Sequence, residues 1–419
     1  MYVMLHDYIL QHKELKDRIM ESKIPSWLNE DFLAAAFQGG IDQQPKVSIL
    51  SFKIASSTSF EGFSSDIFRV KVSYKLQNST QEHSKSLVIK VPDVSGLIYN
   101  VVGPIILEKE VLYYNVLLPK MMKKVNFSFA PLSYHSTVDK VIVMEDLGSD
   151  YRIANKHEQL DFDHCKLVVA TMAKYHASTV ALYNENRDLI EFVGREGFFP
   201  EGGPLRGWVE LGVRTMGEAL QKMGGFERYA DFFLSRVDTI WDELVDCLKP
   251  KAGRLNVLNH GDLWVNNLFF KYNKESVVEV KFIDYQVSRY SLPATDLVYF
   301  VYSSAQHEVR EHRQKELYSH YLEVLNSTLE QLDCPERLTP EQFKEDMKTV
   351  TPWFIGVSVF GVALICAAET KDEPNFFGFT AEDFVAGKPN SDILKVLHGD
   401  VFNSRISHMV RQYLAFIES

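Results

Sequence analysis

A short polar stretch, Asn259–Asn267 (NHGDLWVNN), carries the residues of this chain that are best suited to chemistry. An apolar pair and a polar turn, Asn273–Glu275, come after it, and a second apolar run, Val277–Ile283, then leads to Asp284. Runs of this length around a polar turn predict a β-hairpin. We therefore expect a loop carboxylate, an amide five residues later and a strand-end carboxylate to lie close together.

This set of groups suits the transfer of a phosphoryl group from a nucleotide to a hydroxyl. Such a reaction needs a carboxylate that orients the hydroxyl and accepts its proton, a role that fits Asp262. It also needs hard oxygen ligands for Mg²⁺, which Asn267 and Asp284 can supply. In the alternative interpretation, both aspartates only cap turns and His260 is a core histidine. The combined spacing favours chemistry.

The residues before this stretch predict a small β-rich lobe. From Lys46 the hydrophobic period is two, and a helix at about 105–118, which we expect to stop at Pro119, interrupts the strands. The strands that we expect are 47–54, 66–76, 87–91, 133–136 and 141–144. This order of elements indicates an α+β lobe of about 100 residues.

The rest of the chain is mainly helical by its pattern. Helices are expected at 162–183, 208–223 and 226–248, and again from Asp296 onward. We divide the chain into three parts: an N-terminal helical extension (1–45), a β-rich N-lobe (46–147) and a large helical C-lobe (148–419). Within the extension, a helix that opens at Ile24–Leu28 is expected to run to about Phe37.

Composition excludes several classes of protein. The chain of 419 residues has a net charge of −11 and no basic cluster, which argues against nucleic acid or an anionic membrane as a partner. Four widely separated cysteines suit a reducing compartment, and no secretory signal is visible, so we expect a cytoplasmic protein. The uncharged stretch Trp353–Ala368 is shorter than the ~20 residues of a membrane span and predicts a buried helix.

The motifs resemble those of a known family. HGDLWVNNLFFKY, followed by VKFIDYQVSRYSLPATDLVYF, is similar to the ecdysteroid kinase-like family, in the aminoglycoside phosphotransferase and choline kinase branch of the protein-kinase-like superfamily. The resemblance implies a bilobal kinase fold, with ATP and Mg²⁺ as cofactors. Tyr285-Gln286 departs from the Phe-Gly of protein kinases, and no activation loop is recognisable, which favours a small-molecule kinase.

The resemblance also implies nucleotide-binding residues. Lys90, at the end of the third strand, matches the lysine that holds the phosphates, and Glu110 matches its helix partner, with Glu108 as the alternative. A reduced phosphate loop would use Gly62, Ser64 and Ser65. Three residues mark the expected adenine hinge: Met144, Glu145 and Leu147.

For several other residues, a structural role is at least as plausible as a functional one. Asp296 resembles the aspartate that braces the catalytic loop, although an N-cap role would explain it equally well. His176 is expected to be a packed core histidine. Trp264 could wall the acceptor site or pack inside the loop, and the segment 192–208 is a lid, an acceptor wall or a plain surface loop.

The expected acceptor is a small-molecule alcohol. With 52 aromatic residues and an acidic balance, a bulky apolar alcohol is favoured over a polycationic aminoglycoside, and the resemblance implies an ecdysteroid-like hydroxyl or another lipophilic alcohol. Two alternatives remain open: a choline or sugar kinase, and a nucleotide-binding pseudokinase. The oligomeric state does not follow from the sequence.

Overall fold

The computed structural model describes residues 24–39, 46–55, 65–92, 105–148, 150–155, 158–367 and 392–419. The chain divides into two compact units, which are described separately below. The first comprises Met1–Gly96 and Pro131–Gly148, and the second comprises Leu97–Ala130 and Ser149–Ser419. The three-part division drawn from the sequence stays a prediction.

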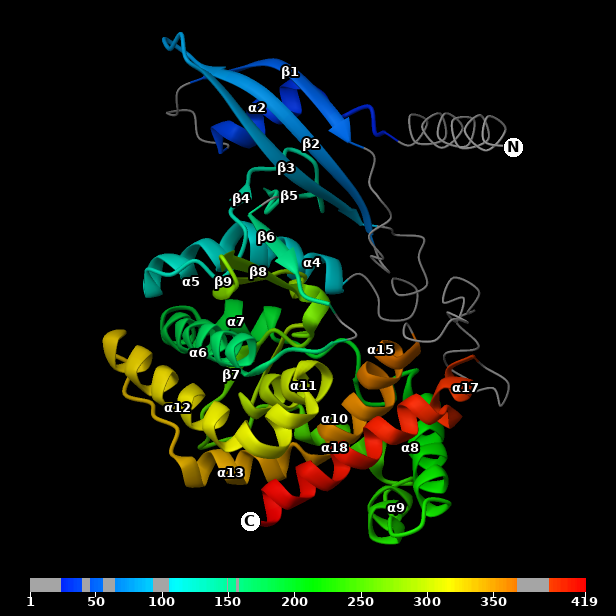
Figure 1. Ribbon diagram of the computed structural model, residues 1–419. Helices are drawn as coiled ribbons and strands as arrows, with labels where there is room; N and C mark the ends of the chain where they lie inside the picture. Colours follow the sequence, from blue (N-terminus) through cyan, green and yellow to red (C-terminus); the bar gives the residue numbers. More distant parts are fainter. Residues whose placement is uncertain are drawn as a thin grey trace, which may run out of the picture. The chain divides into compact units, whose positions relative to one another are not determined.

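The first unit is built on a five-stranded antiparallel sheet in the order β1-β2-β3-β5-β4 (Figure 1). Its strands are β1 (Val47–Ala55), β2 (Ser65–Leu76), β3 (Glu82–Pro92), β4 (Ser133–Tyr134) and β5 (Ile142–Glu145). One helix, α2 (Glu30–Gln38), packs on this sheet and buries Phe32 and Leu33 in the core. The β-rich N-terminal region expected from the period-two pattern is confirmed.

Local chemistry sets both ends of α2. The side chain of Asn29 accepts a hydrogen bond from the backbone N–H of Phe32 at 3.0 Å, and Gly39 ends the helix with a left-handed φ of 68°. The helix expected from Ile24 therefore begins only at Glu30. Ahead of the cap, the chain forms a turn in which Leu28 N–H donates to the Pro25 carbonyl.

The second unit is mainly helical, and two small sheets lie within it. One sheet has the order β6-β8-β9 and the other pairs β7 with β10. Their bounds are β6 (Tyr151–Ile153), β7 (Val257–Asn259), β8 (Leu268–Asn273), β9 (Ser276–Phe282) and β10 (Arg289–Ser291). The hairpin expected around Asn273 is confirmed as β8 and β9. Strands β6 and β10 were not predicted, because three residues are too few to show a hydrophobic period.

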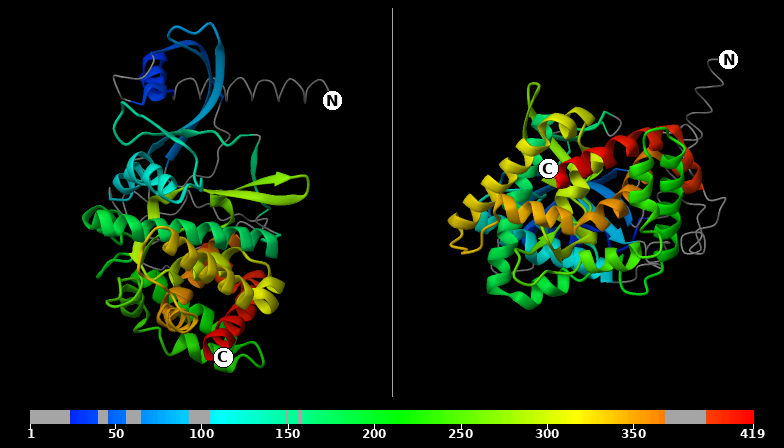
Figure 2. Two further views of the ribbon diagram at one scale, coloured as in Figure 1. Left: turned by 90° about the vertical axis from the view of Figure 1, so that its left-hand side faces the viewer. Right: turned by 90° about the horizontal axis from the view of Figure 1, so that it is seen from below.

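Most of the second unit is helical, and the β8–β9 hairpin projects from its helices (Figures 1 and 2). Their bounds are α4 (Ile105–Leu112), α5 (Leu118–Val125), α6 (Phe162–Glu185), α7 (Arg187–Val193), α8 (Arg206–Gln221), α9 (Glu227–Leu234), α10 (Ile240–Cys247), α11 (Ala294–Ser304), α12 (Gln314–Gln331), α13 (Pro340–Thr349), α14 (Thr351–Val357), α15 (Ala363–Ala367), α17 (Asp392–His398) and α18 (Asp400–Glu418). The predicted mixed class, with a β-rich N-terminal and a helical C-terminal region, is confirmed.

Two helix predictions were wrong in detail. Pro119 does not stop the helix that follows Ile105. A π-helical turn η1 (Tyr113–Leu117) intervenes, and Pro119 then lies in the first turn of α5. The segment 226–248 forms two helices, α9 and α10, since the chain turns between Leu234 and Ile240.

The long apolar stretch that begins at Trp353 is buried, as expected, at every position whose burial the structure describes. It consists of α14, the π-helical segment η5 (Ser358–Val362) and α15, and Ala368 lies outside the described residues. In the part of the chain that the structure describes, no helix combines the length and the apolar character that crossing a bilayer requires.

Candidate active site

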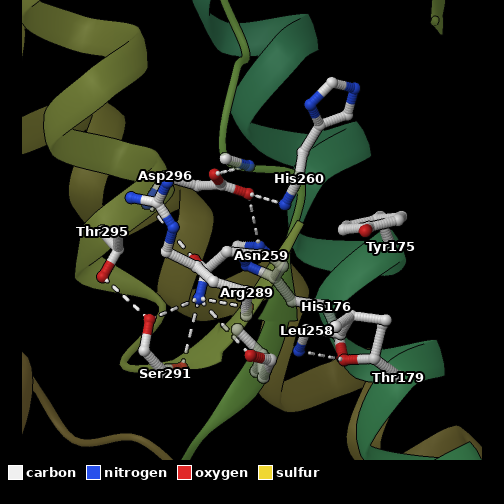
Figure 3. A network of polar contacts seen from close by, with 12 residues as sticks. Tyr175, His176, Thr179, Leu258, Asn259, His260, Arg289, Ser291, Thr295 and Asp296 are labelled. Atoms are coloured by element: carbon white, nitrogen blue, oxygen red, sulfur yellow. Dashed lines mark hydrogen bonds and ion pairs between the residues drawn. The ribbon is translucent and has the colours of Figure 1, made fainter. Parts of the chain in front are cut away.

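The loop Asn259–Asn267 leaves the buried strand β7 and is fastened on several sides (Figure 3). β7 pairs with β10 in antiparallel register, so that Asn259 lies opposite Arg289. The Asn259 amide nitrogen donates to the Ser291 hydroxyl at 3.1 Å, and its amide oxygen accepts from the backbone N–H of Asp296 at 3.2 Å. The backbone N–H of Leu258 donates to the Thr179 hydroxyl of α6 at 3.1 Å. The start of the loop is therefore rigidly held.

The carboxylate of Asp296 braces the next two residues of the loop (Figure 3). It accepts hydrogen bonds from the backbone N–H groups of His260 at 2.7 Å and Gly261 at 2.8 Å, and His176 Nε2 lies 3.1 Å away. Burial alone would raise the pKa of Asp296, yet these hydrogen bonds and nearby histidines hold that pKa below its usual range. The helix cap is Pro293, so the bracing role of Asp296 is confirmed and the N-cap role is wrong.

Gly261 is required by the backbone at this point. Its φ is 85°, and a Cβ atom built on it would lie 2.1 Å from the carbonyl oxygen of Val287. The loop thus passes in close contact with η3 (Tyr285–Val287), the segment that directly follows Asp284.

His176 is fully buried, as predicted for a core histidine, and also contacts the Tyr321 hydroxyl at 2.8 Å.

His260 connects the loop to the end of β9. Its Nε2 lies 3.0 Å from the carbonyl oxygen of Ile283, and its Nδ1 accepts from the backbone N–H of Asp262 at 3.3 Å. Burial lowers the pKa of His260, which favours the neutral ring with its proton on Nε2. The imidazole therefore serves to join two segments that both carry predicted site residues.

Both carboxylate oxygens of Asp262 accept hydrogen bonds. Oδ1 accepts from the Tyr299 hydroxyl at 2.6 Å, and Oδ2 accepts from the Asn267 amide nitrogen at 3.0 Å. The same nitrogen donates to the Asp262 carbonyl at 2.8 Å. Burial raises the pKa of Asp262 to about 7, although its two side-chain donors oppose this rise. A carboxyl whose pKa is close to neutral can take up a proton during a reaction and release it again.

Asn267 and Asp284 lie at neighbouring ends of the hairpin. The backbone N–H of Ile283 donates to the Asn267 carbonyl at 3.1 Å, which joins the residue before β8 to the residue before Asp284. The Asn267 amide nitrogen is engaged by Asp262. Asp284 has a left-handed φ of 69°, and Gln286 Nε2 donates to its carboxylate at 3.3 Å.

This donor set fits Mg²⁺. The described residues contain no cluster of three or more His, Cys, Asp and Glu side chains. At nucleotide sites, Mg²⁺ is coordinated by few protein oxygens, such as one carboxylate and one amide oxygen. Water and phosphate oxygens complete its coordination, because Mg²⁺ gives up its water reluctantly. Metal binding by Asn267 and Asp284 stays a prediction.

The predicted phosphate-binding lysine and its partner lie in different units. Lys90 is on β3, opposite Ile67 and Ile142, and is 9% exposed. Glu110 is on α4 and is 2% exposed, whereas Glu108 is exposed. Their burial favours Glu110 over Glu108 for a structural or catalytic role. Pairing of Lys90 with Glu110 stays a prediction.

The remaining predicted nucleotide contacts are in the first unit. Gly62 and Ser64 lie outside the described residues, while Ser65 begins β2 and has a buried hydroxyl that makes no hydrogen bond within the described part of the chain. Met144 and Glu145 end β5, and Leu147 follows with 8% exposure. Their contact with a nucleotide stays a prediction.

Side-chain interactions fix the predicted hinge. Asp146 accepts from Arg69 Nη1 at 2.9 Å and from the Ser86 hydroxyl at 2.8 Å. The backbone N–H groups of Glu145 and Asp146 donate to the carbonyls of Leu132 and Ser86. These two N–H groups are therefore occupied, and we expect Leu147 to offer its own to a ligand.

The first half of the segment 192–208 packs against other parts of the helical unit. The Gly194 carbonyl accepts from the Tyr290 backbone N–H at 2.9 Å, and Glu196 Oε2 lies 3.0 Å from Arg289 Nε. Phe199 is buried and meets the Trp353 ring edge-on at a centroid distance of 5.7 Å. The surface-loop interpretation is wrong for these residues, and a role as an acceptor wall, for them and for Trp264, stays a prediction.

Sequence reasoning missed Tyr299, although a signal was present. Tyr299 follows Asp296 by three residues, and this spacing places both side chains on one face of a helix. Since Asp296 was expected to contact the catalytic loop, the same face pointed to Tyr299.

Arg289 was missed as well. It is 1% exposed and its guanidinium lies 4.3 Å from the centre of the Trp353 ring.

Comparisons with known proteins assign the chain to a family. The model of the ecdysteroid kinase-like family matches residues 59–334, which is more than half of the chain. Among curated protein sequences, none matches the chain.

Three solved structures illustrate the likeness. An ethanolamine kinase from Plasmodium vivax is 13% identical over 86% of this chain and 81% of its own, with a TM-score of 0.39. A choline/ethanolamine kinase family protein from Mesorhizobium loti is 10% identical over 83% and 89%, with a TM-score of 0.34. The GDP complex of aminoglycoside 2'-phosphotransferase-IIIa is 13% identical over 90% and 99%, with a TM-score of 0.42. These scores are low, so the assignment depends on the family model.

The family match defines the class of protein: a small-molecule phosphotransferase. More narrowly, the chain belongs to the ecdysteroid kinase-like family. The family and the enzyme class expected from the sequence motifs are confirmed.

Proposed function

We propose that this enzyme transfers the γ-phosphoryl group of ATP, with Mg²⁺, to a hydroxyl of an ecdysteroid-like or other lipophilic alcohol. The observation that carries the proposal is the environment of the Asp262 carboxylate, which sets its orientation and its pKa. Its carboxylate is fixed by Tyr299 and Asn267, and burial raises its pKa to about 7. This is the character of a group that accepts a proton near neutral pH.

In the proposed reaction, Asp262 orients the acceptor hydroxyl and takes its proton. The hydroxyl oxygen forms a bond to the γ-phosphorus while the bond from that phosphorus to the bridging oxygen of ADP breaks, and the products are a phosphate ester and ADP. The amide of Asn267 restricts the carboxylate to one orientation. The rigid loop contributes to rate because it holds the base in position before the acceptor arrives.

Asn267 and Asp284 would hold the metal. When bound, Mg²⁺ neutralises charge on the phosphate oxygens. Support for this pairing comes from the backbone hydrogen bond between Ile283 and Asn267. The Asn267 amide nitrogen is engaged by Asp262, so its oxygen would be the atom that binds the metal.

The first unit and α4 would supply the remaining nucleotide contacts. Lys90 would bind the phosphates and Glu110 would fix it, a role that the burial of both side chains supports. The phosphate loop would use Gly62, Ser64 and Ser65, and the hinge residues Met144, Glu145 and Leu147 would contact the adenine. The buried, unpartnered hydroxyl of Ser65, within the described residues, is consistent with a donor awaiting an anion.

The proposed acceptor class follows from the family and from composition. The family is described by its likeness to ecdysteroid kinases, and the chain contains 52 aromatic residues. We also propose that the enzyme works in the cytoplasm, which would suit its four buried, free cysteines.

The test is phosphate transfer from Mg·ATP to a panel of acceptors, followed by mass spectrometry. The panel contains ecdysteroids, other steroids, choline, ethanolamine and an aminoglycoside. D262N serves as the catalytic control. D346N is its matched control, because Asp346 is also an aspartate with a pKa raised to about 7 by burial, but it lies on α13, outside the loop.

A phosphorylated ecdysteroid or other steroid that forms with the parent and with D346N, and not with D262N, would support the proposal. A phosphorylated choline, ethanolamine or aminoglycoside would keep the reaction and overturn the acceptor class. If ATP binds and no acceptor is phosphorylated, the proposed function fails, and a nucleotide-binding pseudokinase replaces it.

A further inference from the structure

The carboxylate of Asp262 is held from two sides by donors of different origin. The Asn267 amide lies on the same loop, and its contact with Asp262 spans only five residues of chain. The Tyr299 hydroxyl comes from α11, and it approaches Oδ1 to 2.6 Å, the shorter of the two contacts. A hydrogen bond to an ionised acceptor is roughly twice as strong as a neutral one. Tyr299 therefore fixes Asp262 relative to the helical scaffold.

Packing fixes the Tyr299 ring itself. The ring stacks on the Trp353 indole of α14, with centroids 6.0 Å apart and an interplanar angle of 21°. The indole N–H in turn donates to the Thr295 carbonyl of α11 at 2.9 Å. The hydroxyl has little freedom to swing away from Asp262.

The residue that braces the backbone of the loop, Asp296, lies on the same turn of α11 as Tyr299. Asp296 binds the backbone of His260 and Gly261, and Tyr299, three residues later, binds the side chain of Asp262. One helix thus sets both the path of the loop and the direction of its reactive group. Burial and the adjacent carboxylate keep the pKa of Tyr299 well above 10, so the hydroxyl remains a donor at neutral pH.

We propose that Tyr299 is a positioning residue that orients Asp262 for its reaction with the acceptor hydroxyl. The proposal rests on the proposed role of Asp262 as the base. Tyr299 acts through the carboxylate and makes no bond to the phosphate. Its removal should lower the turnover number and leave nucleotide binding intact, because the nucleotide contacts come from other residues.

Y299F tests this, since it removes the hydroxyl and keeps the ring on Trp353. Y302F is the matched control: Tyr302 lies one turn later on α11, is fully buried, and its hydroxyl accepts from Gln314 Nε2 at 2.9 Å. ADP formation from Mg·ATP is measured with the acceptor pool described above for the parent, Y299F, Y302F, D262N and the double variant D262N/Y299F.

We expect Y299F to lower kcat by about tenfold with KM for ATP changed by less than about twofold, as for the loss of one charge-assisted hydrogen bond. Y302F should keep kcat. D262N/Y299F should be no slower than D262N, because the hydroxyl acts only through the carboxylate. Unchanged turnover in Y299F, or a further tenfold loss in the double variant, overturns the proposal.

The two proposals fail in distinguishable ways. If D262N is as active as the parent, the proposed function is wrong whatever Y299F does. If the parent shows no turnover, a crystal structure of Y299F decides the positioning role: a carboxylate that turns away from its Asn267-bound orientation supports it, and an unmoved carboxylate overturns it.

Discussion

The Asp296 carboxylate holds the backbone of Gly261 through an N–H bond of 2.8 Å, although the two residues are 35 positions apart. The bond is buried, and the neighbouring N–H of His260 donates to the second oxygen of the same carboxylate. The loop Asn259–Asn267 therefore depends on a charged side chain from α11 for its shape, and several consequences can be measured.

Asp296→Asn should weaken this brace. An amide of the same size has one acceptor oxygen and no charge, so one backbone N–H loses its partner and faces an NH₂ group. Leaving one buried backbone N–H without its acceptor costs about 1–3 kcal/mol, and the contact of His176 Nε2 with this side chain would weaken as well. We expect denaturant unfolding to show a loss of that order, with most turnover lost. D242N, at an exposed carboxylate, is the control. Equal stability of the two variants would contradict the bracing role.

Gly261→Ala should be far more damaging than the same change at Gly225. Both glycines have a left-handed φ, 85° and 86°, which costs an alanine about 1–2 kcal/mol. Only at Gly261 would the new methyl group also meet a backbone carbonyl at 2.1 Å, whereas nothing lies within 4 Å at Gly225. Denaturant unfolding of both variants should show a larger loss for G261A, accompanied by loss of turnover. Equal losses would show that the loop can move away from Val287.

The buried carboxyl of Asp346 should make stability depend on pH. Burial raises its pKa to about 7, against about 3.9 in an unfolded chain, despite its ion pair with Arg254. The folded protein thus binds more protons than the unfolded chain between about pH 4 and 7. The contribution of Asp346 is largest at low pH and falls as the pH rises to about 7.

Thermal unfolding of D346N and the parent between pH 5 and 8 checks this. We expect the melting temperature of the parent, relative to that of D346N, to fall as the pH rises toward 7 and to level off above it. E345Q, at the exposed neighbouring position on α13, controls for a general change of charge. A difference that is constant or grows with pH would contradict the raised pKa.

Asp284→Ala should act on the nucleotide site more than on the base. Loss of a carboxylate ligand should raise the Kd for Mg·ATP by at least about tenfold, since Mg²⁺ at such sites depends on one or two carboxylates. Isothermal titration with Mg·ATP and with ATP alone separates the two effects. We expect the variant to bind ATP alone as the parent does. Unchanged affinity for Mg·ATP would exclude Asp284 as a metal ligand.

Much of the site could be predicted from sequence because its residues are close together in the chain. Asp262 and Asn267 share one loop, and the hairpin that follows has a clear period of two, so the short distance between Asn267 and Asp284 follows from local rules. The strands β1 to β3 were likewise visible from their alternating pattern.

Contacts set by tertiary packing could not be predicted in this way. The approach of Tyr299 to Asp262 depends on how α11 packs against Trp353 and on the π-helical segment η5. Pro119 was misjudged because a proline stops a helix in its interior and starts one in its first turn, and the sequence did not reveal the π-helical turn between them. Strands of three residues, such as β10, are too short to show a period.

The most direct test of the central claim is the comparison of D262N with the parent in turnover and in Mg·ATP affinity. If Asp262 is the base, D262N should lower kcat by about 10²–10⁴-fold in ADP formation with the acceptor pool. Its Kd for Mg·ATP, measured by titration calorimetry, should stay within about twofold of the parent, while D346N should match the parent in both. A D262N enzyme that turns over at the parental rate would contradict the account.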